Sequence, residues 1–261
     1  MTDVAVAIQG EAGSFSHAAA REALGPGVRL VPCPTFDELF RTVEAGQAGR
    51  GVVPIENSLA GSVYEAYDAL GGHALHVVGE TQVRVRHCLV VRPGTALPAI
   101  RRVASHPVAL AQCRRFFVDH PAITSVPAYD TAGSVRDLLA GRLEADAAIG
   151  SALAAQLYGG DILLEGIEDH PENYTRFLVV AREPGSLDGT SKTSLVFVLP
   201  NVPGSLHRAM GFFATRGLDL SKIESRPLIG RPWEYAFYLD VLGDPRGAVA
   251  DALAELAALA R

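Results

Sequence analysis

Residues 170–177 hold the side chains best suited to chemistry on an anionic ligand. They read His170-Pro171-Glu172-Asn173-Tyr174-Thr175-Arg176-Phe177. Arg176 offers a planar guanidinium fork for a carboxylate. Thr175 points to the other face of an extended chain, where its hydroxyl can hydrogen-bond a leaving oxygen. Residues 173–181 are expected to form a strand, so these side chains can line the floor of a cleft. The alternative is an edge strand with a surface arginine.

The loop 10–16 follows the first expected strand and opens a helix. Its backbone amides and the hydroxyls of Ser14 and Ser16 can meet an anion at the helix N-terminus. It lacks the third glycine of a dinucleotide fingerprint and the Gly-Lys-Ser/Thr ending of a P-loop. A tight turn with Ser16 as the N-cap explains the same residues.

Glu56, Asn57 and Ser58 directly follow a buried strand expected over residues 51–55 and precede a helix. The carboxyl end of a strand in an open α/β sheet is where ligands bind. The alternative is that Asn57 or Ser58 only caps the next helix.

Two more strand-to-helix junctions lie further along the chain. His106 precedes a proline at the first position of a helix expected over 107–120, and Gln112 on that helix can point inward or lie on the surface. Thr131 follows Asp130 at the other junction, where capping is again the simpler explanation. Together the junctions favour a site of backbone amides and hydroxyls, which suits carboxylates.

Other kinds of site find little support in the sequence. The formal net charge of -6, the pI near 5.7 and the scattered basic residues exclude a nucleic-acid footprint. No nucleophile elbow or zinc-protease motif occurs. His73 and His76 lack a convincing third ligand, so we expect no metal. Cys33, Cys88 and Cys113 are expected to be buried thiols.

The start of the chain and its hydropathy predict a cytoplasmic protein. Residues 1–3 lack the basic opening and long apolar stretch of a signal peptide, and no apolar run approaches the length of a membrane span.

Short apolar runs alternate with amphipathic stretches over residues 4–91, the signature of a parallel sheet covered on both faces. A second α/β set follows over residues 103–164. No further element of the second set follows the strand expected over 173–181. The chain should therefore cross back at this strand and complete the first sheet. Two lobes, about 1–83 with 173–183 and about 84–172, would then enclose a cleft, where small ligands bind.

Residues 185–192 are rich in turn formers and are expected to be a linker. Residues 193–261 then read as βαββα, a ferredoxin-like half-sandwich one strand short of the full pattern.

In their order and spacing, these segments together resemble the prephenate dehydratase family over essentially the whole chain. The family's Gly-x-x-Gly-Ser/Thr-Phe/Tyr-Ser loop matches residues 10–16, and its Pro-Ile-Glu-Asn-Ser/Thr motif matches residues 54–58. Ser-His-Pro matches 105–107, Thr131-Ala132 matches a Thr-Ala element, and the catalytic Thr-Arg-Phe signature stands at residues 175–177. Glu11 and Asp130 stand where the family usually has proline and serine or threonine.

The tail resembles an ACT domain, the family's regulatory unit. Its effector loop matches residues 201–206, and its Glu-Ser-Arg-Pro motif matches residues 224–227. The family commonly continues through a further short strand, so this unit either stops short at Arg261 or closes differently. The resemblance implies a phenylalanine site between paired ACT domains, and a homodimer or homotetramer. The residues implied in that site are Asn201, Gly204, Ser205, Leu206, Glu224, Ser225, Arg226 and Pro227.

The resemblance implies a periplasmic-binding-protein-like catalytic domain over 1–184 that converts prephenate to phenylpyruvate without a cofactor. Thr175 would donate to the departing oxygen as part of the Thr175-Arg176-Phe177 signature. The residues implied in substrate binding are Ser14, Glu56, Asn57, Ser58, His106, Gln112, Thr131 and Ala132. Glu56 and His106 both stay open as the proton relay to Thr175.

Three other functions remain open from the sequence. Arogenate dehydratase removes the same atoms from the amino analogue of prephenate. A solute receptor shares the two-lobed fold, and an amino-acid sensor would have an inert first domain.

Overall fold

The computed structural model describes residues 4–186, 189–228 and 230–260. The chain divides into two units, residues 1–184 and 185–261. Four parts of the sequence predictions lie outside the described residues: the first three residues, positions 187 and 188 of the expected linker, Ile229 in the turn before the last expected strand, and Arg261.

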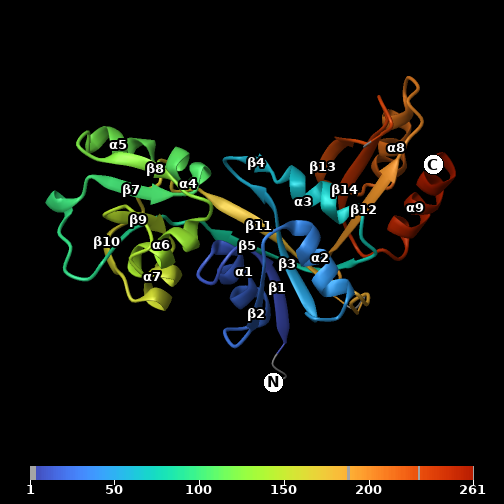
Figure 1. Cartoon of the computed structure of the whole chain (residues 1–261). Coiled ribbons are helices and arrows are strands. Elements are labelled where there is room, and N and C mark those ends of the chain that lie inside the picture. Colours follow the sequence, from blue (N-terminus) through green and yellow to red (C-terminus); the bar gives the residue numbers. More distant parts are fainter. Residues whose placement is uncertain (1–3, 187–188, 229, 261) are drawn as a thin grey trace. The chain divides into compact units, whose positions relative to one another are not determined.

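The first sheet of the first unit is mixed, where the sequence predicts a parallel one (Figure 1). Its strands are β1 (Ala5–Gln9), β2 (Arg29–Cys33), β3 (Arg50–Asn57), β5 (His76–Arg84) and β11 (Tyr174–Ala181), in the order β2-β1-β3-β11-β5, with β4 (Gly61–Ser62) paired to β3. The predicted return of the chain is confirmed, because β11 lies between β3 and β5. It enters antiparallel to both neighbours, which makes the sheet mixed.

Helices α1 (Phe15–Leu24), α2 (Phe36–Glu44) and α3 (Tyr64–Leu70) accompany this sheet. Ser14, not Ser16, is the N-cap of α1, because its side chain accepts a hydrogen bond from the His17 amide. Ala19 of α1 packs in one core cluster with Ile8 and Phe177. This cluster fixes β11 against α1. We call this sheet and its helices the first lobe.

The second lobe has its own sheet, in the order β10-β6-β9-β7-β8. Its strands are β6 (Cys88–Val91), β7 (Arg102–Ser105), β8 (Thr124–Pro127), β9 (Ala147–Gly150) and β10 (Asp161–Glu165). Its helices are η1 (Leu97–Ala99), α4 (Pro107–Gln112), α5 (Arg114–Asp119), α6 (Thr131–Leu139) and α7 (Ala152–Tyr158). Because β8 and β9 both run parallel to β7, their carboxyl ends meet at one edge.

The single helix predicted over 107–120 is wrong, since the chain breaks at Cys113 into α4 and α5. The carboxylate of Asp169 accepts hydrogen bonds from the amides of Arg114 (3.2 Å) and Arg115 (2.8 Å). Those amides would otherwise continue the helix. The Asp169 amide in turn donates to the carbonyl of Gln112 (2.7 Å), so the break fixes Gln112 at the end of α4.

The second unit has the predicted βαββα order. It consists of β12 (Lys192–Val198), α8 (Ser205–Ala214), β13 (Leu220–Pro227), β14 (Tyr235–Leu242) and α9 (Ala248–Leu259). The antiparallel sheet has the order β12-β14-β13. Phe213 of α8, Leu239 of β14 and Val249 of α9 pack in one core. Across the described parts of both units, every helix is too short or too polar to cross a bilayer.

Candidate active site

Thr175 lies at the amino end of β11, directly opposite Asn57 at the carboxyl end of β3. These two ends share one edge of the sheet because the strands are antiparallel. The Asn57 side-chain amide donates to Thr175 Oγ1 over 2.9 Å, and each residue is only 9% exposed. The structure therefore brings together two of the residues that the sequence predicts for the site.

The direction of this hydrogen bond is fixed by the backbone. The amides of Leu59 and Ala60 donate to Asn57 Oδ1 over 3.1 Å and 2.8 Å, and a backbone N–H cannot accept. The other side-chain atom of Asn57 must therefore be the donor nitrogen. Thr175 Oγ1 accepts, and in the described part of the chain no group accepts the Thr175 proton.

From Asn57 the hydrogen bonds continue through two further amides. Asn57 Nδ2 also faces Asn173 Oδ1 at 2.7 Å and the Tyr174 carbonyl at 3.1 Å, so its two hydrogens are shared among three acceptor oxygens. Asn173 Nδ2 donates to Gln112 Oε1 over 3.1 Å. Gln112 Oε1 lies 2.9 Å from His87 Nε2. We call Thr175, Asn57, Asn173, Gln112 and His87 the amide network.

His87 and Asn173 lie on the two segments by which the chain crosses between the lobes. The segments are joined to each other, since the Val85 amide donates to the Asn173 carbonyl over 2.7 Å. Asn173 is fully buried and His87 is 2% exposed. Burial holds the pKa of His87 below its ordinary value. The Phe15 ring and the imidazole form a T-shaped pair, with ring centroids 5.6 Å apart and an angle of 80° between the ring planes.

Sequence reasoning did not select Asn173 or His87 for the site. Asn173 had a usable signal, because it lies within residues 170–177, the segment chosen for its chemistry. His87 had none, since a lone histidine before a strand is most often structural.

Arg176 lies on the sheet face opposite to Thr175. Its Nε and Nη2 both lie 2.8 Å from Glu80 Oε2 on β5, and its side chain is 12% exposed. Glu56 pairs with Arg176 in the strand register and shares its face. The structure therefore separates these two charged residues from the Thr175 hydroxyl, and Arg176 already has a carboxylate partner.

Phe177 is a core residue. It is 1% exposed and packs with Val6, Ile8 and Val52. Its ring is enclosed in the core, and its membership of the catalytic group stays a prediction. Its part is to anchor β11.

The other junction residues serve mainly as caps and ties. Ser58 Oγ accepts from the Tyr174 amide and donates to the Glu172 carbonyl, each over 2.9 Å. His106 Nδ1 accepts from the Val108 amide over 3.3 Å as the N-cap of α4. Within the described residues no hydrogen bond joins His106, Thr131 or Ser14 to the amide network.

Asp130 is the N-cap of α6, and its Oδ1 accepts from the Gly133 amide over 2.6 Å. Burial raises the pKa of Asp130, which this hydrogen bond opposes. Thr131 is half-buried beside it. Ala132 is 1% exposed and belongs to the core of the second lobe, so its side chain has a packing role.

The loop after β1 is held against the second lobe. Ser151 Oγ donates to the Gly13 carbonyl over 2.5 Å, and Tyr158 donates to the Ala12 carbonyl over 2.8 Å. Glu11 pairs with Arg136 over 2.8 Å. Gly13 has φ +87°, and a Cβ there would lie 2.8 Å from Ala154 Cα, so only glycine allows this approach.

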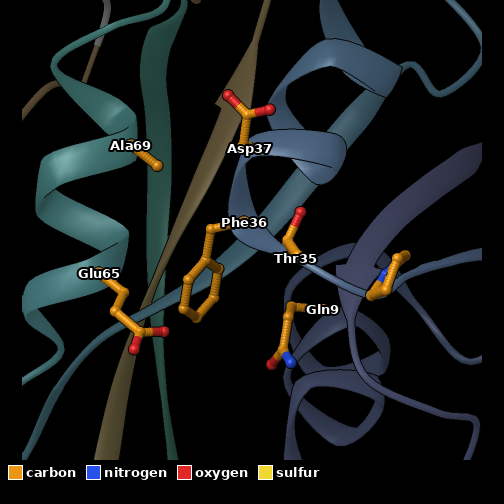
Figure 2. A pocket seen from close by; sticks show the side chains of 7 residues that line it. Gln9, Thr35, Phe36, Asp37, Glu65 and Ala69 are labelled. Carbon is orange, nitrogen blue, oxygen red and sulfur yellow. The ribbon is translucent and has the colours of Figure 1, made fainter.

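A separate cavity of about 220 Å³ opens in the first lobe at the carboxyl ends of β1 and β2 (Figure 2). The residues lining it are Gln9, Pro34, Thr35, Phe36, Asp37, Glu65 and Ala69. No residue of the amide network contributes to its wall, and neither does any residue that the sequence predicts for the site. The cavity is therefore distinct from the candidate active site.

In the second unit the predicted effector residues lie in the loop before α8, in the first turn of α8 and on β13. Asn201 Nδ2 donates to the Trp233 carbonyl over 3.0 Å. Ser205 Oγ donates to the Val202 carbonyl over 3.0 Å, beside Gly204, the N-cap with φ +82°. Leu206 follows on α8 and is 37% exposed.

On β13 the Glu-Ser-Arg-Pro segment alternates between the two faces of the sheet. Glu224 and Arg226 are half-buried, while Ser225 and Pro227 are exposed. Glu224 lies 3.7 Å from the ammonium of Lys222 on the same strand.

Comparisons with known proteins agree with the resemblance seen in the sequence. A family model described as prephenate dehydratase matches residues 6–185. The arogenate dehydratase/prephenate dehydratase 2 of Arabidopsis thaliana, described as chloroplastic, is 43% identical over 249 residues, which cover 91% of this chain. The chain spans 65% of the length of that relative.

Several solved structures match almost the whole chain, and two of them are more than a third identical to it. Prephenate dehydratase from Arthrobacter aurescens in complex with L-Phe has a TM-score of 0.90 and 37% identity, covering 98% of this chain and 87% of that one. A protein described as GqqA, a novel type of quorum quenching acylases, has a TM-score of 0.89 and 37% identity, covering 98% and 94%.

Proposed function

Because the chain belongs to the prephenate dehydratase family, we propose that it converts prephenate to phenylpyruvate, with Thr175 as the donor to the departing oxygen. The observation that carries this proposal is the direction of the bond from Asn57. The Thr175 hydroxyl accepts from that amide, so its own proton stays available for another acceptor.

The proposed reaction breaks two bonds of the substrate. The bond from the ring carbon to its carboxylate breaks, carbon dioxide leaves, and the electron pair enters the ring. The bond from the ring to its hydroxyl oxygen breaks at the opposite carbon, and that oxygen takes a proton and leaves as water. Aromatisation drives the step, so the site has to position the substrate and protonate the leaving oxygen.

The position of Thr175 suits the second task. A threonine hydroxyl is a weak acid in water, and its oxygen becomes negative when the proton leaves. A buried amide donor 2.9 Å away stabilises that developing charge in a region from which water is largely excluded. A proton from solvent restores the hydroxyl after the products depart, which closes the cycle. Glu56 and His106 are the two candidates for the proton relay. Glu56 pairs with Arg176 on the sheet face opposite to Thr175, and His106 caps α4, so neither side chain is hydrogen-bonded to the Thr175 hydroxyl in this structure.

The test is turnover of prephenate with no cofactor added, followed by the ultraviolet absorbance of phenylpyruvate. We expect Thr175→Ala to lower kcat by about 100-fold or more and Thr175→Ser to recover part of it. Thr124→Ala, on an exposed strand of the second lobe, is the control and should retain wild-type kcat. Near wild-type turnover by Thr175→Ala would remove the assigned role.

Arogenate is the second candidate substrate, because the Arabidopsis relative is named for both activities. The two substrates differ by an amino group in place of a keto oxygen. A competition experiment with both substrates, comparing kcat/KM, decides between them.

The likeness to GqqA suggests amide hydrolysis as an alternative activity. A threonine nucleophile needs a base within hydrogen-bond reach. Thr175 receives a hydrogen bond from an amide donor instead, and none of the described histidines or carboxylates contacts its hydroxyl. The geometry favours a proton donor. Hydrolysis of an acylated amine by wild type, lost in Thr175→Ala, would reverse this preference.

For the second unit we propose an ACT-type role in which it binds phenylalanine and pairs with a second copy as a dimer or tetramer. The Arthrobacter aurescens relative, solved with L-Phe, supports the choice of ligand. The backbone carbonyl of Trp233, the one tryptophan of the chain, accepts from Asn201 of the predicted effector loop. A ligand that displaces this loop should shift Trp233, and its fluorescence should respond to phenylalanine. Arg226→Ala should weaken that response, and light scattering gives the oligomeric state. Calorimetry that detects no binding to wild type would contradict the proposal.

The predicted cytoplasmic location stays a prediction. The Arabidopsis relative is named as chloroplastic, and fractionation of the cells that make this protein is the direct test.

A further inference from the structure

We infer that His87 is a positioning residue, which holds the amide network in the orientation that leaves the Thr175 proton free. This inference rests on the proposed dehydratase function and goes beyond it, since His87 occurs in none of the motifs that carry the family resemblance.

The orientation of each amide follows from its neighbour. Asn57 Nδ2 donates toward Asn173, so the atom of Asn173 that faces it must be oxygen. The other Asn173 atom is then the nitrogen, and the atom of Gln112 that faces it must be oxygen. Each side-chain amide has one donor end and one acceptor end. The backbone amides of residues 59 and 60 fix the orientation of Asn57, and this orientation in turn sets those of Asn173 and Gln112.

Gln112 Oε1 can only accept, so the imidazole nitrogen 2.9 Å away must carry a proton. His87 is therefore the Nε2–H tautomer in its neutral form. Burial disfavours the charged form and lowers the pKa of His87, although the hydrogen bond to Gln112 and the charge of Glu168 oppose this. Nδ1 is then a lone-pair acceptor, and it is buried without a hydrogen-bond partner among the described residues.

His87 stabilises one of two orientations of Gln112. Rotating the Gln112 amide by half a turn would place its NH₂ group against the NH₂ group of Asn173 and against the Nε2–H of His87. The imidazole could avoid the second conflict only by moving its proton to Nδ1, where no described residue accepts it. Without His87, one of these two conflicts disappears. Gln112 can then rotate more often, and Asn173 and Asn57 are held less firmly. The alignment of Asn57 with Thr175 depends on this order, and His87, which is 2% exposed, acts through these amides.

The imidazole is held by the rest of its surroundings. The backbone amide of His87 donates to Glu168 Oε2 over 2.8 Å, and the Phe15 ring packs against the imidazole in a T-shaped pair. These contacts hold the imidazole so that its Nε2 stays directed at Gln112 Oε1. A positioning role requires such a fixed ring.

The test compares two replacements of His87. The side-chain nitrogen of glutamine can reach the position of imidazole Nε2 and donate to Gln112, whereas that of asparagine matches Nδ1 and is too short. We expect His87→Asn to lower kcat by roughly 10-fold, the equivalent of one lost buried hydrogen bond, with KM nearly unchanged. His87→Gln should recover most of that loss.

His73→Asn and His73→Gln are matched controls, because His73 lies outside the network, between Glu44 and Asp37, and both should keep wild-type kcat. Thermal unfolding of every variant shows whether a loss of rate follows a loss of fold. Equal kcat for His87→Asn and His87→Gln, or a change confined to KM, would overturn the inference.

Nitrogen NMR of histidine-labelled wild type tests the network without any turnover. We expect His87 to show the neutral Nε2–H tautomer, and the Nδ1–H tautomer would overturn the inference. A wild type that turns over neither prephenate nor arogenate removes the proposed function, and with it the effect on kcat. An active wild type whose His87→Asn variant keeps full kcat removes the inference alone.

Discussion

Replacing Asn57 by aspartate reverses the direction of one hydrogen bond while hardly changing the shape of the side chain. The amides of Leu59 and Ala60 still find an acceptor oxygen. The atom that faces Thr175 Oγ1 at 2.9 Å becomes a carboxylate oxygen, which can only accept. The Thr175 hydroxyl then donates to residue 57, and its proton is no longer free for the leaving oxygen.

The expected loss of rate follows from the strength of that new bond. A hydrogen bond to a charged group contributes about 1.5–3 kcal/mol, and it must break before Thr175 can donate elsewhere. At about 1.4 kcal/mol for each factor of ten, kcat should fall by about 10-fold to about 150-fold. The new oxygen also faces Asn173 Oδ1 at 2.7 Å, so the free energy of unfolding should fall by about 1–3 kcal/mol.

The assay is phenylpyruvate formation at neutral pH and at lower pH, with urea unfolding of the same samples. Protonation of the introduced carboxyl restores a donor at residue 57, so the activity of Asn57→Asp relative to wild type should rise as the pH falls through the pKa of that carboxyl. Gln47→Glu adds the same charge at an exposed position and is the control. A folded Asn57→Asp enzyme with wild-type or higher kcat would refute the reasoning, because it would mean that Thr175 benefits from a base.

Three further predictions follow from burial and packing. Burial raises the pKa of Cys88 to about 11 and also raises that of Cys113, so both thiols stay protonated at neutral pH. A thiol reagent should label them only after unfolding, and labelling of the native protein would contradict this. Gly51→Ala should lower the free energy of unfolding by about 1–3 kcal/mol, since a Cβ at residue 51 would lie 2.8 Å from Val180 Cγ2 and 2.9 Å from Leu39 Cδ2. Urea titration measures this, and an unchanged midpoint would show that the core accommodates the added methyl group. Glu11→Gln should lower the free energy of unfolding by less than about 1 kcal/mol, because its pair with Arg136 is partly exposed. A loss of several kcal/mol in urea unfolding would show that this contact does more than tie the loop after β1 to α6.

The sequence was informative wherever the site depends on strand ends. Asn57 follows a buried strand and Thr175 begins one, and the predicted return of the chain to the first sheet places them together. The same reasoning could not find His87. Its partner Gln112 reaches it only because the helix breaks at Cys113, and that break depends on Asp169, which is distant in the sequence. Local helix propensity carries no sign of such a contact.

The Thr-Arg-Phe segment shows a second limit. Alternation along a strand predicts that Thr175 and Arg176 face opposite sides, as they do. It does not tell which side holds the ligand, and it places Phe177 on the same side as Thr175 without showing that the core begins there. A motif identifies residues that belong together in a family, while burial and partners separate those that can touch a substrate from those that support the strand.

Arg176 offers the sharpest test of that separation. Its Nε and Nη2 both reach Glu80 Oε2 over 2.8 Å, so Arg176→Lys keeps the charge but loses the two-nitrogen contact. If the pair serves β11 and β5, Arg176→Lys and Glu80→Gln should each lower the free energy of unfolding by about 1–3 kcal/mol and leave KM almost unchanged. If Arg176 instead binds a substrate carboxylate, Arg176→Lys should raise KM while Glu80→Gln does not. Urea unfolding and steady-state kinetics on both variants decide between the two, and a rise in KM specific to Arg176→Lys would show that this residue leaves Glu80 to bind the substrate.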